Sequence, residues 1–408
     1  MSDLSDVLTM GERIQTIRER QGISRAVVAG LVGRSPIWLR KIEAGERRLH
    51  SLPMIVKLAR VLNVTDLSEL TGEPLAATVD PWGRVGHPYV INLRNAIHGP
   101  LFGRPLALPE SVDVLAGRTA QAWKTWHTSP MNRTETGAML PELLSAIHAC
   151  VRRSEGAERR RAYAVLASAY GVAQMFAAHT TEPELYWVTV DRARSAAEES
   201  DDPVRLAMAA WVMSNGMASV GNTEECVELL TDAADSLRPM LEDGSDEVRG
   251  VFGSICLKLA ITHAEDGKEG DAWRWWDEAS KTAKLAPRYW HPETAFGSGN
   301  VAVHAVTMGV ELKTPGAALK KAEDTNPEGV PSRERRSRLY VDAARSQWAR
   351  KETSGALHYL STAFEISPES VRYVPPARAL AAELALKATG PLKADAAALA
   401  QEVGITAA

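Results

Sequence analysis

The sequence has little that would support a disulfide framework, a zinc site or a membrane span. Only three cysteines occur among 408 residues, Cys150, Cys226 and Cys256, and no CxxC motif is present. An odd number of widely spaced cysteines favours small buried residues in a reducing compartment. No apolar run reaches the roughly eighteen residues that a membrane span needs, and the acidic start of the chain lacks a signal segment. We therefore expect a soluble cytoplasmic protein with no membrane partner.

Signatures of catalysis are also missing. The sequence contains no G-x-S-x-G, H-E-x-x-H, S-x-x-K or P-loop string. The segment 296–300 has two glycines but lacks the third glycine and the preceding strand of a dinucleotide fingerprint. His291, Glu293 and His304 are residue types that could meet at a metal, but nothing else in the sequence supports that interpretation. We predict that the protein is not an enzyme and needs no cofactor or metal.

A general excess of positive charge is absent too. The chain has 47 Lys and Arg against 51 Asp and Glu, a net charge of −4, which excludes a basic coat over the whole surface. The charge is unevenly distributed, because residues 25–48 contain six basic and two acidic side chains. This stretch has the local charge that a phosphate backbone favours.

The first seventy residues have the pattern of five short helices. Ile14 and Ile17 suit one face of a first helix that ends at Gly22. Two further helices are expected at 24–32 and 35–44, with a glycine-containing turn between them. Each later helix is preceded by a residue that favours an N-cap, namely Ser24, Ser35 (followed by Pro36), Ser51 and Asp66. The spacing of the second and third helices is that of a helix-turn-helix, in which the second of the pair enters the major groove of DNA.

In this region the sequence resembles the DNA-binding domain of Cro/XRE-type regulators. The matching strings are Gly11-Glu12-Arg13-Ile14, Gly22-Ile23-Ser24, Gly33-Arg34-Ser35, Ile42-Glu43-Ala44-Gly45 and Leu58-Ala59-Arg60-Val61-Leu62-Asn63-Val64. The resemblance covers residues 10–71 and implies an all-α domain, placed here at residues 1–72, that binds double-stranded DNA. Since a single domain of this size covers little DNA, it also implies a homodimer on an inverted-repeat operator.

The resemblance assigns roles to individual residues. The position after the N-cap of the second helix, usually Gln in such domains, contacts DNA and is Arg25 in this chain. Arg18 and Glu43 correspond to a pair that fixes the third helix against the first. The start of the third helix reads bases and the flanking cations suit phosphates, which gives the candidate contacts Arg34, Ser35, Pro36, Ile37, Trp38, Arg40, Lys41, Arg47 and Arg48, with His50 beside them.

Some of these roles have structural alternatives. Trp38 is as well suited to packing on the neighbouring turn as to contacting a thymine methyl group. Ile37 suits a methyl contact or a partly buried position better than a role in specificity. Arg47 and Arg48 would also suit a solvated loop.

The remainder of the chain divides into a linker and a helical array. Residues 73–109 contain six prolines and are predicted to be a linker with one short helix near 89–97. Residues 110–408 show Ala-rich helical segments in pairs, with a weak repeat of about forty residues. Its anchors are Tyr340, Ala344, Ala356, Leu360, Ala363 and Pro368, then Cys256, Ala260, Ala272, Trp276 and Ala279, then Ala302, Val306, Ala318 and Ala322. We predict a tetratricopeptide-like (TPR-like) α-solenoid; a generic Ala-rich bundle is the alternative.

The complete layout resembles actinobacterial XRE-type regulators with a TPR-like C-terminal half. That resemblance depends on residues 294–304, supported by 187–197, 342–345 and 368–372. A solenoid of helix pairs presents a concave face that can hold a peptide or a small molecule. Phe296, Asn300 and His304 are one helical turn apart and could line one wall of such a site, although a place in the packed interior is the more usual role for a residue such as His304.

These observations lead to one functional prediction and two alternatives. We predict a sequence-specific transcriptional regulator whose C-terminal array senses a peptide or small-molecule effector and controls operator binding. A DNA-tethered adaptor whose solenoid recruits a protein partner is the second reading. A helix-turn-helix protein that processes its ligand is the third.

Overall fold

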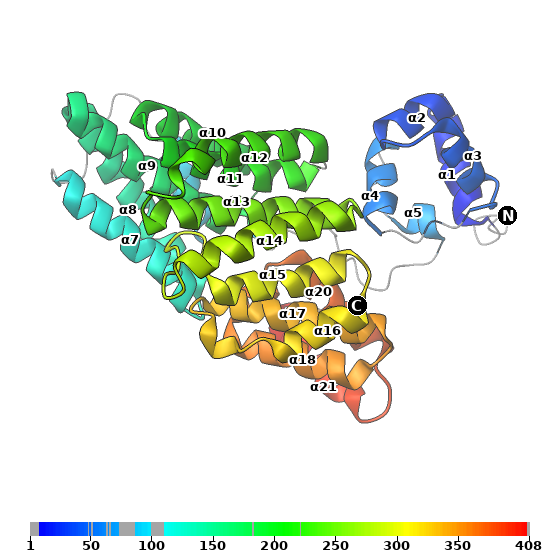
Figure 1. The fold of residues 1–408 in the computed structure, drawn as a ribbon. Helices are drawn as coiled ribbons and strands as arrows, with labels where there is room; N and C mark the ends of the chain where they lie inside the picture. The colour runs from blue at the N-terminus through cyan, green and yellow to red at the C-terminus, as the bar shows by residue number, and fades with distance from the viewer. Residues whose placement is uncertain are drawn as a thin grey trace. The chain divides into compact units, whose positions relative to one another are not determined.

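The computed structural model forms two compact units, which are described separately. The first lies within residues 1–83 and the second within residues 84–405. The residues that the structure describes are 8–47, 49, 52–62, 64, 67–72, 86–98, 110–181, 183–220 and 222–405. Over these ranges the regular structure is helical throughout, with no strand, so the all-α prediction is confirmed (Figure 1).

The first unit contains five short helices around one apolar core. They are α1 (Met10–Arg20), α2 (Arg25–Leu31), α3 (Pro36–Glu43), α4 (Leu52–Val61) and α5 (Ser68–Thr71). The hydroxyl groups of Ser24 and Ser35 accept hydrogen bonds from the backbone N–H groups of Val27 and Trp38, as expected of N-caps. The predicted caps Ser51 and Asp66 lie outside the described residues. The core contains Ile14, Val28, Leu39, Leu58 and Leu62.

The second unit is an array of longer helices. They are α6 (Val90–Ile97), α7 (Val112–Thr128), α8 (Asn132–Arg153), α9 (Gly156–Ala177), α10 (Pro183–Ser200), α11 (Pro203–Val220), α12 (Thr223–Leu237), η2 (Arg238–Met240), α13 (Asp246–Glu265), α14 (Glu269–Leu285), α15 (Ser298–Glu311), α16 (Pro315–Asp324), η3 (Pro327–Gly329), α17 (Arg333–Ala349), α18 (Thr353–Ile366), α19 (Pro368–Arg372), α20 (Pro375–Lys387) and α21 (Leu392–Val403).

The long helices form two layers of antiparallel pairs. Each odd-numbered helix from α7 to α17 contacts the next odd-numbered helix as well as its neighbour along the chain, which makes these helices the inner layer. The even-numbered helices cover them, as Figure 1 shows for α14 over α13 and α18 over α17. This arrangement of stacked hairpins is the predicted TPR-like solenoid.

Small residues let the paired helices approach one another. The α13–α14 hairpin buries the repeat anchors Ala260, Ala272 and Ala279 completely. The α17–α18 hairpin likewise buries Ala344 and Ala356. These alanines occupy the small positions of the predicted repeat, whereas its large anchors Trp276 and Tyr340 are half-buried. The three cysteines are also buried and unpaired, as expected.

One helix of the second unit lies within the range predicted as a linker. Helix α6 packs on α8, and its Leu93 and Ile97 join the main apolar core. The short helix predicted near 89–97 is therefore present, and it contributes to a folded unit. Within the 73–109 range, the structure describes only residues 86–98.

The array curves far enough for its first inner helix to touch its sixth. On α7, His127 Nδ1 is 2.9 Å from the Ser332 hydroxyl oxygen, at the start of α17. At the start of α8, the backbone N–H of Arg133 and the hydroxyl of Thr134 donate to the Glu369 carboxylate of α19, at 2.6 and 2.5 Å. We call these the closure contacts. They join residues more than 200 positions apart in the chain.

None of the described helices combines the length and the apolar character that crossing a bilayer would demand.

Close helix contacts in the second unit lead to a first testable expectation. Gly253 lies inside α13, and a Cβ added there would be 2.0 Å from the Phe296 ring. We expect Gly253→Ala to lower the free energy of unfolding by about 1–3 kcal/mol through overpacking. Gly117, inside α7, faces open space. Gly117→Ala is therefore the matched control. It should raise the free energy of unfolding, measured in urea, by about 0.5–1 kcal/mol. Equal stabilities of the two variants would contradict the packing described.

Candidate nucleic-acid interface and interior pocket

Helix α3 has one buried face and one exposed face. Leu39 and Ile42 are buried in the core of the first unit. Ile37, Arg40 and Lys41 are exposed, and the exposed fraction of Ile37 is 65%. Residues 37, 40 and 41 recur at helical spacing and so share one stripe of α3. An exposed stripe that combines cations with an apolar side chain is what contact with phosphates and a thymine methyl group would need.

A buried carboxylate holds this helix in place. Glu43, only 3% exposed, accepts hydrogen bonds from Arg18 Nε at 2.6 Å and Arg18 Nη2 at 3.2 Å. The pKa of the Arg18 guanidinium is raised by these contacts. The expected Arg18–Glu43 pair is therefore confirmed, and it ties α1 to α3.

Arg25 has a second role that the sequence did not indicate. Its Nε pairs with the same Glu43 carboxylate, which links the start of α2 to the end of α3. The Arg25 side chain nevertheless stays 42% exposed. Because Nε is already bonded, the terminal nitrogens are the ones left to reach DNA.

The other predicted DNA contacts differ in how free they are. Arg40 forms an exposed ion pair with Glu46 at 3.0 Å. Arg34, Lys41 and Arg47 are exposed, and no acidic side chain in the described part of the chain pairs with them. Ser35 and Pro36 are also exposed and form the N-terminal turn of α3. Trp38 is half-buried against the core of the unit. Arg48 and His50 lie outside the described residues.

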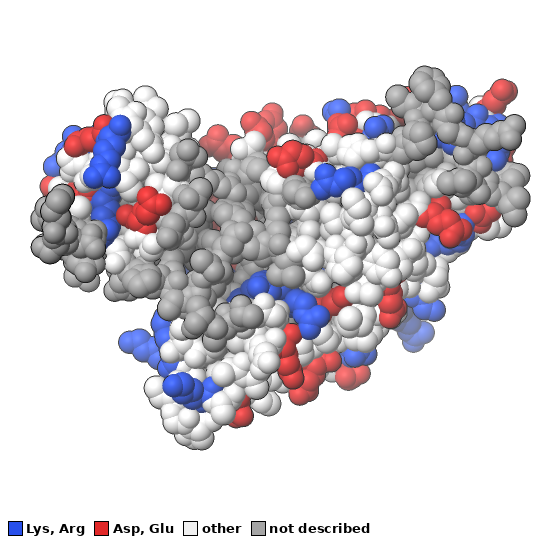
Figure 2. All heavy atoms as spheres, turned by 180° about the vertical axis from the view of Figure 1, so that it is seen from behind, with Lys and Arg blue, Asp and Glu red and all other residues white. Residues whose placement is uncertain are grey.

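Charge is arranged differently on the second unit. In the view of Figure 2 its described Lys and Arg side chains are interspersed with Asp and Glu. Many of them form local ion pairs, such as Arg249 with Asp246 and Arg274 with Asp271. On this face the charges of the second unit largely compensate one another.

The three predicted effector contacts do not share a helix face. Helix α15 begins at Ser298, and Phe296 precedes it in a loop where Ala295 has a positive φ of 58°. The assumed one-turn spacing from Phe296 to Asn300 is therefore wrong. The Phe296 ring is 3% exposed and packs against Gly253.

Asn300 and His304 are one turn apart, as assumed. His304 Nδ1 lies 2.8 Å from the backbone carbonyl of Asn300. Burial lowers the pKa of His304 to about 3, so the ring is neutral. Asn300 is 3% exposed, and its Oδ1 has no hydrogen-bond partner among the described residues. A ligand role for these three residues stays a prediction.

A pocket lies elsewhere on the inner layer. It has a volume of about 200 Å³ and is bounded by α7, α9, the start of α11 and the loop before α15. Its lining is Ala116, Thr119, Ala120, Trp123, Ala164, Val165, Ser168, Arg205, Pro292 and Glu293. Most of these side chains are apolar, and the polar ones gather at one end.

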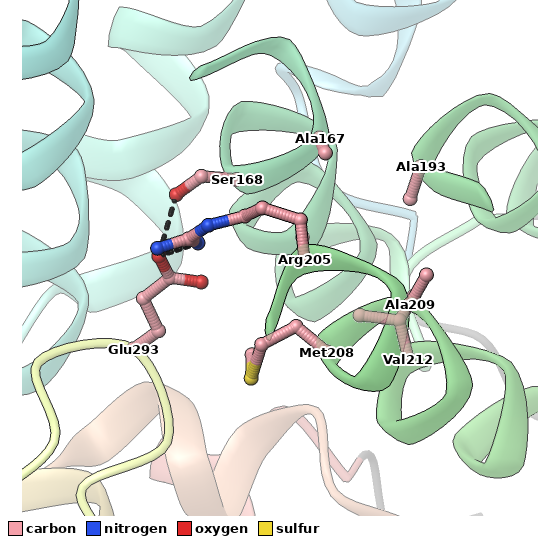
Figure 3. Close-up of a pocket in the computed structure, with 9 residues that line it drawn as sticks. Ala167, Ser168, Ala193, Arg205, Met208, Ala209, Val212 and Glu293 are labelled. Atoms are coloured by element: carbon pink, nitrogen blue, oxygen red, sulfur yellow. Dashed lines mark hydrogen bonds and ion pairs between the residues drawn. The ribbon is translucent and has the colours of Figure 1, made fainter. Parts of the chain in front are cut away.

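The polar end of this pocket is centred on Glu293. Figure 3 shows the polar group from an adjoining smaller cavity, which shares Ser168, Arg205 and Glu293 with the pocket. Its Oε1 accepts hydrogen bonds from the Ser168 hydroxyl at 2.9 Å and from Arg205 Nη1 at 2.5 Å. Burial raises the pKa of Glu293, but Arg205 and its other polar neighbours lower it more, so the net shift is downward and the carboxylate is ionised. Arg205 also pairs with Glu247 at 2.6 Å.

Sequence reasoning did not find this pocket. Ser168, Arg205 and Glu293 are separated by tens of residues and form no motif. The sequence placed Glu293 only in a conceivable metal group with His291 and His304. In the described residues no three His, Cys, Asp or Glu side chains are arranged to hold a metal ion.

Helices α2 and α3 of the first unit have the helix-turn-helix arrangement. The family model described as "Helix-turn-helix domain" matches residues 9–70, which span α1 to α5. Beyond this segment the second unit is the TPR-like array, so the chain joins a helix-turn-helix segment to a helical-repeat unit.

Two solved structures show a distant likeness to the chain. One is a Rap protein complexed with competence and sporulation factor, with a TM-score of 0.45, 10% identity, and coverage of 72% of this chain and 74% of that chain. The other is ComR from S. thermophilus in complex with DNA and its signalling peptide ComS, with a TM-score of 0.27, 14% identity, and coverage of 88% and 99%. No curated protein matches the chain.

Proposed function

We propose that this protein is a cytoplasmic, sequence-specific transcriptional regulator that binds an inverted-repeat operator as a homodimer. In this proposal the TPR-like unit binds a peptide or small-molecule effector and thereby controls operator binding. The exposed stripe of α3, with Ile37, Arg40 and Lys41 inside a helix-turn-helix domain, is the observation that carries it.

The stripe suits the major groove of DNA. Lys41 is uncompensated in the described part of the chain and can donate to guanine O6 or N7, and Ile37 can contact a thymine methyl group. Arg40 first has to exchange its exposed partner Glu46, which costs little because surface ion pairs contribute about 0–1 kcal/mol. Arg34 and Arg47 flank α3 and suit phosphates, which fix the position of the domain without reading sequence.

The effector would act through linkage. A ligand that binds more tightly to one arrangement of the dimer raises the population of that arrangement. If the two arrangements differ in how well they place two copies of α3 one helical turn of DNA apart, operator affinity changes by the same coupling free energy. The proposal needs no catalytic step.

The test begins by letting the full-length protein select duplexes from a random DNA pool. On the selected sequence, we expect Lys41→Ala to weaken specific binding by about 1–3 kcal/mol, which corresponds to roughly 5- to 150-fold. The control is Lys124→Ala, which removes an exposed side chain of α7 in the second unit and should leave the affinity for the selected DNA unchanged. Arg47→Ala should weaken binding to all duplexes alike and reduce the salt slope by about one. Failure of the wild-type protein to enrich any sequence, or wild-type affinity in Lys41→Ala, would contradict the proposal.

A further inference from the structure

The pocket between α7, α9 and α11 has room for one compact ligand. An apolar cavity of about 150 Å³ is large enough for benzene. At about 200 Å³, this pocket accommodates an aromatic ring or a branched aliphatic group with a short substituent. The walls that such a group would contact are apolar, formed by Val165, Pro292 and small alanines, and Trp123 lies behind them at 1% exposure.

The polar end of the pocket has unused acceptor capacity. Ser168 and Arg205 both donate to Oε1 of Glu293. Oε2 accepts no hydrogen bond from the described residues, and the Glu293 side chain is 9% exposed. An ionised carboxylate oxygen with free lone pairs favours a strong donor.

The local charge favours a cation over an anion. Glu293 and Glu247 both pair with Arg205, so two carboxylates surround one guanidinium and the group has a net charge of −1. A carboxylate or phosphate head group would lie beside Glu293 without a free cation to receive it. An ammonium group would neutralise the cluster and bond to the free oxygen.

From these observations we propose that the pocket between α7, α9, α11 and the Pro292–Glu293 loop binds a compact amine, with its apolar body against Val165 and Pro292 and its ammonium group on Glu293. This proposal names a site and a chemical class for the effector, and to that extent depends on the proposed function. The site is separate from the Phe296, Asn300 and His304 positions, which do not line it.

The pocket wall is also connected to the closure contacts. Trp123 stacks on His127 with a centroid separation of 6.0 Å, and His127 Nε2 lies 3.2 Å from the backbone carbonyl of Glu293. The other ring nitrogen of His127 contacts Ser332 on α17. An occupant that bonds to Glu293 holds the loop whose carbonyl contacts His127. It therefore stabilises the closed curvature of the array, and its binding raises the melting temperature of the protein.

The experiment uses the full-length protein and three probes with similar phenyl bodies, 2-phenylethylamine, 2-phenylethanol and phenylacetate. Binding is measured by ligand-observed NMR titration. We expect the amine to bind at least about tenfold more tightly than phenylacetate, with the alcohol between them. The amine should also raise the melting temperature, and phenylacetate should leave it unchanged.

Two variants locate the site. Ala120→Phe places a ring on the exposed edge of the pocket and should abolish amine binding, while Gln121→Phe adds the same ring at the next exposed position, outside the pocket, and should leave it intact. Glu293→Gln should remove most of the preference for amine over alcohol. Equal binding of the three probes, absence of amine binding, or undiminished binding in Ala120→Phe would overturn the proposal. DNA selection is measured separately. A protein that selects a duplex but does not bind the amine would contradict only the pocket proposal. A protein that binds the amine but selects no duplex would contradict only the DNA-binding proposal.

Discussion

Replacing Glu43 by Ala is expected to unfold the helix-turn-helix segment and with it abolish the proposed DNA binding. Glu43 is buried and satisfies both Arg18, whose side chain is 7% exposed, and Arg25. Removing the carboxylate leaves the buried Arg18 with only the exposed Glu19 and the Ile23 carbonyl as partners. Breaking a buried pair costs up to about 3–5 kcal/mol. A domain of some sixty residues has little stability to spare.

Hydrogen exchange resolved by mass spectrometry measures this effect within the full-length chain. Amides of α1, α2 and α3 should lose protection in Glu43→Ala, while amides of α13 and α17 should not change. Glu46→Ala is the matched control, because it removes an exposed carboxylate whose ion pair with Arg40 contributes about 0–1 kcal/mol. Native-like protection of α1–α3 in Glu43→Ala would show that the carboxylate does not hold the domain together.

The second large effect is a loss of stability in mild acid. His127 and His291 are 0% and 1% exposed, and burial lowers the pKa of each ring to about 4. In the unfolded chain a histidine takes up its proton near pH 6.5. The native state therefore has its full stability above pH 6.5 and loses it as the pH falls towards 4, because only the unfolded state gains the protons.

The size of this effect follows from the pKa difference. Each pKa unit corresponds to about 1.4 kcal/mol, so at pH 5 each of the two histidines destabilises the folded state by about 2 kcal/mol. We expect urea unfolding, followed by tryptophan fluorescence of the full-length protein, to give a free energy of unfolding at least about 4 kcal/mol lower at pH 5 than at pH 7, because His304, with its pKa of about 3, adds to the loss. Equal stability at the two pH values would mean that these rings are protonated, or accessible to water, in the native state.

The parts of the structure that could be predicted from sequence depend on local signals. Ser24 and Ser35 cap the helices of the helix-turn-helix because their side chains reach backbone groups three residues away. The buried alanines of the hairpins could be recognised because close helix packing requires small residues at fixed spacing. The Arg18–Glu43 pair was expected from the family resemblance and not from the spacing of the two residues.

The parts that could not be predicted depend on long-range geometry. Phe296 was assigned to a helix because nothing in the sequence marks the left-handed turn at Ala295. The pocket brings together Ser168, Arg205 and Glu293 through the stacking of three hairpins, which depends on the curvature of the whole array. Curvature is a sum of small rotations between neighbouring pairs, and no single residue encodes it.

The closure contacts have a consequence for how this protein can change. In an open stack of hairpins, a unit can be deleted or duplicated, because each one touches only its neighbours. Here His127 meets Ser332, and Glu369 meets Arg133 and Thr134, only if the intervening number of hairpins is kept. Gain or loss of one hairpin between α9 and α16 would leave these polar groups facing the wrong neighbours, so variation in length is confined to loops and to the helices that follow α19.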